Sequence, residues 1–183
     1  RLIKRPNGGA WVNTGSTTTE PPTSLSLVKA EGLSGFSDFA LGTQYCKVVT
    51  NGNDDGIGSL RFAIAQCSNP EDYIYIAEFI DSIFLVSDTI ILDKNLSIFH
   101  SGNEKVVIQT TSSSPVFKTN PGVLITLNNI EIHSGGVASS KALLNNGNTI
   151  LWNVDIINSI PGEIPVMNTG ILEISETVQI KNQ

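Results

Sequence analysis

The sequence predicts an all-β protein whose larger part is a parallel β-helix. From residue 73 onward the chain is a succession of short β-forming runs separated by turns, and none of it has the helical period of about 3.6 residues. Units of similar pattern recur there at a nearly constant spacing. One short helix-like segment, residues 60–66, precedes these runs.

Residues 1–43 contain strand-like pieces separated by turns rich in Gly, Pro and Asn. About four strands with few apolar residues do not make an independent domain, because a small sheet needs a second layer to bury its apolar face. The expected strands are residues 1–4, 10–13, 24–29 and 37–41. We interpret residues 1–43 as the closing strands of an upstream domain or as a linker extension of the capped β-helix, residues 44–183.

The segment between Cys46 and Cys67 predicts a short amphipathic helix. A short strand and a turn rich in Asn, Asp and Gly lead to Ser59, which stands where a helix N-cap belongs. Leu60 and Ile64 then recur at helical spacing, and an Asn-Pro pair follows Cys67 and ends the helix. An even number of cysteines is compatible with one disulfide.

The last part of the chain repeats. Each unit reads as strand, turn with Asn and Gly, strand, polar turn and strand. The units are residues 116–132, 142–156 and 166–180, and their turn glycines are Gly122, Gly147 and Gly170. A period in the low twenties with three strands fits one coil of a solenoid, in which like strands stack about 4.8 Å apart. A β-sandwich of hairpins is the alternative, and the nearly constant spacing favours the solenoid.

Aliphatic and aromatic residues of these strands are expected to point inward and form one apolar column. They are Ile98, Ile108, Phe117, Leu124, Leu127, Ile130, Ile132, Leu143, Ile150, Val154, Ile156, Val166, Leu172, Ile174, Val178 and Ile180. Asparagines at the corners suit left-handed turns and stacked side-chain amides. They are Asn128, Asn129, Asn145, Asn146, Asn153 and Asn168.

Composition and charge exclude several functional classes. The formal net charge is -6, and the 11 Lys and Arg residues are scattered, so we expect no nucleic-acid partner. No apolar run approaches the roughly 20 residues that a membrane-spanning helix needs, so we expect a protein that does not span a membrane.

Enzymatic activity is not expected, although it needs to be weighed. A polysaccharide lyase needs carboxylates that hold Ca²⁺ and a base, and a hydrolase needs two or three converging carboxylates. Glu131, Asp155 and Glu173 stand singly and at unmatched positions of the units. His100 and His133 lie in expected turns without a Cys or carboxylate at ligand spacing. We therefore expect no catalytic, metal or cofactor site.

Two features have a structural and a functional interpretation. Residues 51–56 match the first half of a Ca²⁺ loop, but Phe62 stands where that loop requires a bidentate Glu, so a turn is favoured. Trp152 is expected to pack at the corner of a coil, whereas an exposed aromatic ring there is able to stack on sugar.

Residues 46–67 resemble the N-terminal cap of the pectin-lyase-like, right-handed parallel β-helices of large secreted bacterial surface proteins. The shared features are a valine-rich strand, an Asn/Asp turn, Gly-Ser-Leu-Arg at 58–61, Ala-Ile in a short helix, and flanking cysteines. Residues 88–98 and the repeated units are also similar to coils of that family.

This resemblance implies a lid on the end of the apolar column, formed by Ser59, Leu60, Arg61 and Ile64. Arg61 is expected to hydrogen-bond carbonyl groups of the cap or nearby carboxylates. A disulfide between Cys46 and Cys67 would tie the lid to the first strand and would place the protein in an oxidising compartment.

Residues 9–15 and 35–42 are similar to a segment that follows long ectodomains in proteins exported by bacterial type IX secretion. Together the two resemblances imply a C-terminal part of a secreted or cell-surface protein. We expect a non-catalytic structural or adhesive module, with a contribution to export recognition. The alternative is a carbohydrate-binding or polysaccharide-cleaving β-helix. Expected partners are the upstream domains of the same polypeptide, the type IX export machinery and surface glycan.

Overall fold

The computed structural model describes residues 2–6, 12–13, 37–41, 47–67, 72–136, 140–175 and 177–182. The chain divides into two compact units, residues 1–44 and 45–183. In the first unit, β1 (Leu2–Pro6) pairs antiparallel with both β2 (Val12–Asn13) and β3 (Ser37–Leu41). The expected strand at 24–29 lies outside the described residues.

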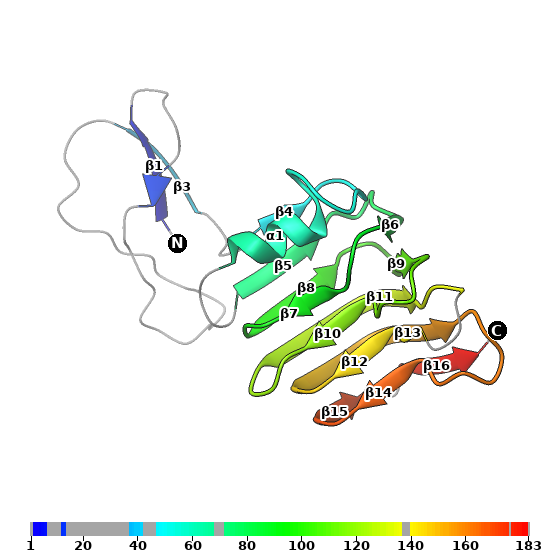
Figure 1. The fold of residues 1–183 in the computed structure, drawn as a ribbon. Coiled ribbons are helices and arrows are strands. Elements are labelled where there is room, and N and C mark those ends of the chain that lie inside the picture. Colours follow the sequence, from blue (N-terminus) through cyan, green and yellow to red (C-terminus); the bar gives the residue numbers. More distant parts are fainter. Residues whose placement is uncertain are drawn as a thin grey trace. The chain divides into compact units, whose positions relative to one another are not determined.

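The second unit is a parallel β-solenoid of about 5 turns, as the sequence predicts (Figure 1). Each complete coil contributes one strand to each of three stacked parallel sheets. Sheet 1 contains β4 (Lys47–Val49), β5 (Asp72–Ile76), β8 (Leu96–His100), the first parts of β11 (Leu124–His133) and β13 (Asn148–Asn158), and β15 (Ile171–Ile174). Sheet 2 contains β6 (Ser82–Leu85), β9 (Val106–Thr110), the second parts of β11 and β13, and β16 (Gln179–Asn182). Sheet 3 contains β7 (Ile90–Leu92), β10 (Phe117–Thr119), β12 (Leu143–Asn145) and β14 (Val166–Asn168).

Asparagines turn the corner between sheets 1 and 2. Asn129 and Asn153 have φ of 59° and 51°, and these left-handed residues bend β11 and β13 without ending them. Asparagine tolerates this conformation because its short side chain makes local hydrogen bonds. Here Asn153 Nδ2 donates to Asn129 Oδ1 at 2.8 Å, so the two amides stack as predicted.

A second polar ladder lines the corner between sheets 3 and 1, inside the solenoid. Asn145 accepts hydrogen bonds from the hydroxyl groups of Thr119 and Thr149, and its own Nδ2 donates to Asn168 Oδ1 at 2.7 Å. These bonds join three successive coils through side chains alone. Buried polar groups are thereby paired, which keeps the cost of their burial small.

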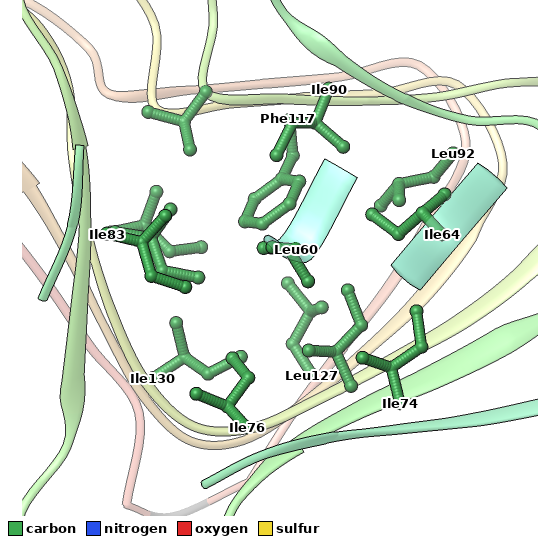
Figure 2. Close-up of a cluster of buried hydrophobic side chains, with 14 of the residues drawn as sticks. Leu60, Ile64, Ile74, Ile76, Ile83, Ile90, Leu92, Phe117, Leu127 and Ile130 are labelled. Carbon is green, nitrogen blue, oxygen red and sulfur yellow. The ribbon is translucent and has the colours of Figure 1, made fainter. Parts of the chain in front are cut away.

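The core is one continuous column of apolar side chains along the coil axis, mostly aliphatic but including Phe117, and is seen in cross-section in Figure 2. Ile83, Ile108, Ile132 and Ile156 occupy one stacked position in sheet 2, and all four are fully buried. Most of the expected inward positions are confirmed. Two are wrong, because Leu124 is exposed and Ile150 is only half-buried, while Ile125 and Leu151 point inward beside them.

The register also corrects the expected repeat. Leu124, Asn148 and Ile171 are aligned across three coils, so Gly147 and Gly170 share a position that Val123 occupies in the coil before. A side chain at Gly170 would meet the backbone oxygen of Gly147, which accounts for glycine there. Gly122 instead belongs to a separate turn, where its φ is 80°.

The predicted helix is confirmed as α1 (Leu60–Gln66), which precedes the complete coils. Its buried residues are Leu60, Ala63 and Ile64, and in Figure 2 Leu60 and Ile64 lie among the inward side chains of the strands. The helix therefore closes the N-terminal end of the apolar column. No helix of the described segments is long and apolar enough to cross a membrane.

Candidate functional site

The outer face of sheet 1 carries two of the four exposed aromatic side chains of the described residues, Tyr73 and Trp152, together with the half-buried rings of Tyr75 and Phe99. Because side chains alternate along a strand, this face is formed by the residues between the inward ones. Its exposed or half-buried apolar members are Val48, Tyr73, Tyr75, Phe99, Leu124, Ile150, Trp152 and Ile171. We call these eight residues the apolar face.

Two features of the apolar face bear on binding. The rings of Tyr73 and Phe99 stack with centroids 5.5 Å apart, so neighbouring coils hold them in fixed positions. Trp152 is 55% exposed, which corrects the expectation that it packs at a corner of a coil. Beside them a hollow of about 340 Å³ is lined by Tyr73, Asn95, Leu96, Ser97, Leu124 and Thr126. The hollow thus places amide and hydroxyl groups next to an aromatic ring.

A polar cluster lies on the outer face of sheet 2. Glu131 and Asp155 are aligned partners on adjacent coils, which corrects the expectation that they occupy unmatched positions. Glu173 pairs with Ile150 in sheet 1 and is remote from this position in the register. β11 and β13 are paired with one constant offset on both sides of the corner residues Asn129 and Asn153, so the spacing of these asparagines already indicates that Glu131 and Asp155 are aligned.

Each carboxylate of this cluster is paired with a basic side chain. Lys105 Nζ lies 2.7 Å from Asp155 Oδ1, and His133 Nε2 bonds to Glu131 Oε1. A shallow hollow of about 390 Å³ beside them is lined by Asn103, Glu104, Lys105, Asn129, Glu131, Asn153 and Asp155. One of these ion pairs lies within β11, and the other reaches from the start of β9 across the coil of β11 to β13.

The positions of the histidines also differ from the expectation. His100 and His133 lie in β8 and β11, not in turns. Glu131 and His133 are two residues apart and so face the same side of a strand, a signal that was readable in the sequence. His100 points inward, and its Nδ1 bonds to the backbone oxygen of Glu104. In the described parts of the chain, no three His, Cys, Asp or Glu residues are grouped as metal ligands.

The cap residues meet at the N-terminal end of the column. Ser59 Oγ accepts a hydrogen bond from the Phe62 N–H at 3.1 Å and so caps α1. Arg61 donates to Asp54 Oδ1 at 2.9 Å and to the backbone oxygens of Asp88 and Thr89. The guanidinium therefore joins the turn before α1 to the first complete coil.

The other end of α1 is held by a residue that sequence reasoning missed. Lys94 Nζ donates to the backbone oxygens of Ile64 and Cys67, at 3.2 and 2.7 Å. Cys67 is buried at the C-cap of α1. Cys46 lies outside the described residues, so the disulfide between the two stays a prediction.

The fold and these surfaces define a parallel β-solenoid with a capped end, an apolar face on one sheet and a polar, ion-paired face on another. No family model, curated protein or solved structure matches the chain. Its function has to be argued from these surfaces.

Proposed function

We propose that the chain is a non-catalytic structural and adhesive module of a secreted or cell-surface bacterial protein. The observation that supports it is the apolar face: aromatic and aliphatic side chains left in water on a rigid sheet. Val48, Tyr75 and Phe99 form an unbroken row on this face, and Asn128 separates that row from Trp152. A row of exposed apolar side chains is a candidate interaction site. Strand β8, which lies within the apolar face, pairs with a parallel neighbour on each side. Binding to this face would therefore need little reordering of the backbone.

The resemblance to capped β-helices of secreted surface proteins supports the location. The separate resemblance of residues 9–15 and 35–42 to a segment of type IX-exported proteins supports upstream domains of the same polypeptide as the natural partners, with the type IX export machinery as the route. A disulfide between Cys46 and Cys67 fits an oxidising compartment.

Carbohydrate binding by the same face is the second candidate. The hollow beside Tyr73 favours it, because Asn95, Ser97 and Thr126 offer hydrogen-bond donors and acceptors next to an aromatic ring. Polysaccharide cleavage has weaker support, since the aligned carboxylates Glu131 and Asp155 are both engaged by basic side chains.

Binding of the labelled chain to washed Gram-negative cells and to a panel of purified polysaccharides tests the proposal. We expect Trp152→Ala to weaken binding about tenfold, the effect of losing one buried aromatic anchor. Ile91→Ala is the matched control, because Ile91 is equally exposed but lies on sheet 3.

The outcomes separate the candidates. Binding to cells and not to polysaccharides supports adhesion to a protein partner, and binding to both supports the carbohydrate alternative. Release of sugar fragments would show an enzyme. Absence of binding to either would contradict adhesion.

A further inference from the structure

Lys105 and Asp155 form a close contact that solvent barely reaches. Lys105 Nζ lies 2.7 Å from Asp155 Oδ1, and the two side chains are only 19% and 13% exposed. Lys105 directly precedes β9 and Asp155 lies in β13, with β11 between these two strands. An amine and a carboxyl group from coils that are not neighbours are thereby held against each other.

The contact is close, but it is not a hydrogen bond. Asp155 Oδ1 is shielded from solvent and has no hydrogen-bond partner among the described residues, although Lys105 Nζ lies within reach. The bond directions at the two atoms, rather than their distance, therefore fall outside hydrogen-bond geometry. Buried carboxylate oxygens are normally hydrogen-bonded, because leaving them unpaired is costly, so this oxygen needs another explanation.

A second carboxylate lies beside this contact. Glu131 is aligned with Asp155 on the adjacent coil, where stacked strands are about 4.8 Å apart. Glu131, Asp155 and Lys105 all line the same hollow on the outer face of sheet 2. His133 Nε2 bonds to Glu131 Oε1 and so fixes the direction of this carboxylate. One hollow thus holds an amine, the carboxyl group that it contacts and a carboxylate that is able to transfer protons.

We propose that Lys105 and Asp155 condense to an amide between Nζ and Cγ, a covalent cross-link from the start of β9 to β13. The Nζ–Cγ bond forms, one Cγ–O bond breaks, and one water molecule leaves. The ammonium and the carboxylate together contain all the atoms of the amide and the water, so the reaction needs no oxidant, reductant or activated co-reactant. This inference is independent of the adhesive function proposed above.

Glu131 carries a proton in this reaction. It takes one proton from the Lys105 ammonium and passes it to the Asp155 carboxylate, which leaves a neutral amine beside a carboxylic acid. Nζ attacks Cγ, a second proton moves from Nζ to a hydroxyl group of the intermediate, and water departs. Nζ keeps one hydrogen as the amide N–H, and Glu131 is again a carboxylate. Because a carboxyl C–O bond is about 1.2 Å long, Nζ starts no more than about 4 Å from the carbon that it attacks.

Two features of the site favour the amide over the ion pair. Charges kept away from water are costly, and amide formation removes both of them. Groups held in one geometry also react as if they were highly concentrated, at about 10⁵–10⁸ M for well-oriented intramolecular pairs. Here β9 pairs with β6 and β11, and β13 pairs with β11 and β16, so the stacked coils keep the two groups together.

The intact mass of the full chain, measured after reduction of any disulfide, tests the cross-link. We expect the mass to lie below that calculated from the sequence by one water molecule. Proteolysis should then yield a branched peptide that contains both Lys105 and Asp155, identified by fragmentation in the mass spectrometer. Lys105→Arg and Asp155→Ala should each restore the calculated mass, because neither variant retains both reacting groups.

Glu131→Gln tests the proton carrier. Loss of a general acid–base group should slow formation of the cross-link by about 10²–10⁴-fold, so the purified variant should have the full calculated mass. Glu104→Gln is the matched control, because Glu104 lines the same hollow and should be dispensable. Circular dichroism of each variant checks that the solenoid has folded.

Three results would overturn the proposal. The first is a folded wild-type chain with the full calculated mass. The second is a loss of water that persists in both Lys105→Arg and Asp155→Ala, since a cyclic imide at Asp55, which precedes Gly56, removes the same mass without joining two peptides. The third is equal cross-linking in Glu131→Gln and Glu104→Gln, which would show that Glu131 does not carry the proton.

Discussion

Asp54 connects the turn before α1 to the first complete coil. Its Oδ1 accepts a hydrogen bond from Arg61 and its Oδ2 accepts one from the backbone N–H of Ser87 at 2.7 Å. Burial by itself raises the pKa of Asp54. Hydrogen bonds from the Ser87 side chain, from Arg61 and from the Ser87 backbone, together with the Arg61 charge, outweigh it and lower the pKa below the ordinary value of 3.8.

This lowered pKa makes stability depend on pH. The ionised Asp54 stabilises the fold at every pH above its unfolded pKa, and the stabilisation is lost as the pH falls through the lower pKa of the folded state. We expect Asp54→Asn to reduce the free energy of unfolding by about 1–3 kcal/mol at neutral pH. That difference should shrink once the pH falls below 3.8.

Denaturant unfolding of both proteins, from neutral to acidic pH, measures this difference. Asp55→Asn is the control, because the Asp55 side chain is exposed and accepts a hydrogen bond from the backbone N–H of the next residue, Gly56. A deficit of Asp54→Asn that stays constant down to strongly acidic pH would show that ionisation of Asp54 is not its source.

Single residues also show where the sequence alone does not determine which side chains point into the core. Ile98 lies between a polar and an aromatic residue that both face outward, and its inward direction was predicted correctly. Leu124 and Ile125 are adjacent aliphatic residues, so alternation leaves two choices that differ by one residue. Pairing of Ile125 with Leu96 on the preceding coil decides between them. That partner is about one coil away in sequence and is not readable from the local pattern.

At the scale of elements, the capping helix depends on two basic residues. Arg61 reaches Asp54 and the backbone before β7, and Lys94 reaches the last carbonyl groups of α1. The helix, its N-cap and its buried face were predictable because local spacing determines them. The role of Lys94 was not predictable, because its contact with the end of α1 forms only when the second complete coil stacks on the first.

Removing the ammonium group of Lys94 should loosen α1. In Lys94→Met the carbonyl groups of Ile64 and Cys67 lose their donor, which should destabilise the helix by about 1–3 kcal/mol. Hydrogen exchange of residues 60–67 should speed up accordingly, while exchange in β11 and β13 stays unchanged. Lys118→Met is the control, as Lys118 points outward from β10. Equal acceleration in both variants would contradict a specific role for Lys94.

At the scale of the whole molecule, the repeat was enough to predict the fold, because any unit of three short strands buries its apolar side only by stacking on its neighbours. The surface clusters were harder to predict. Lys105 reaches Asp155 across an intervening coil, a contact that depends on how three successive coils stack and that no local pattern in the sequence indicates. Composition reveals the charges of such a cluster but not their proximity.

Nearest-neighbour stacking makes stability depend on position along the axis. Ile132 and Ile180 occupy the same column, but Ile132 has a coil on each side and is fully buried, whereas Ile180 has one neighbour and is 45% exposed. Ile132→Ala should therefore reduce the free energy of unfolding by about 2–5 kcal/mol, the range for a buried aliphatic truncation. Ile180→Ala should reduce it by less than about 1 kcal/mol, because half of its side chain is already in water.

Denaturant unfolding compares the two truncations of the same side chain. Hydrogen exchange measures the free energy of local opening of each strand. If each coil is stabilised chiefly by its neighbours, β16 should open at a lower free energy than β11. Equal losses of stability in the two variants, with equal protection of the two strands, would mean that the last coil is buried as deeply as the middle one.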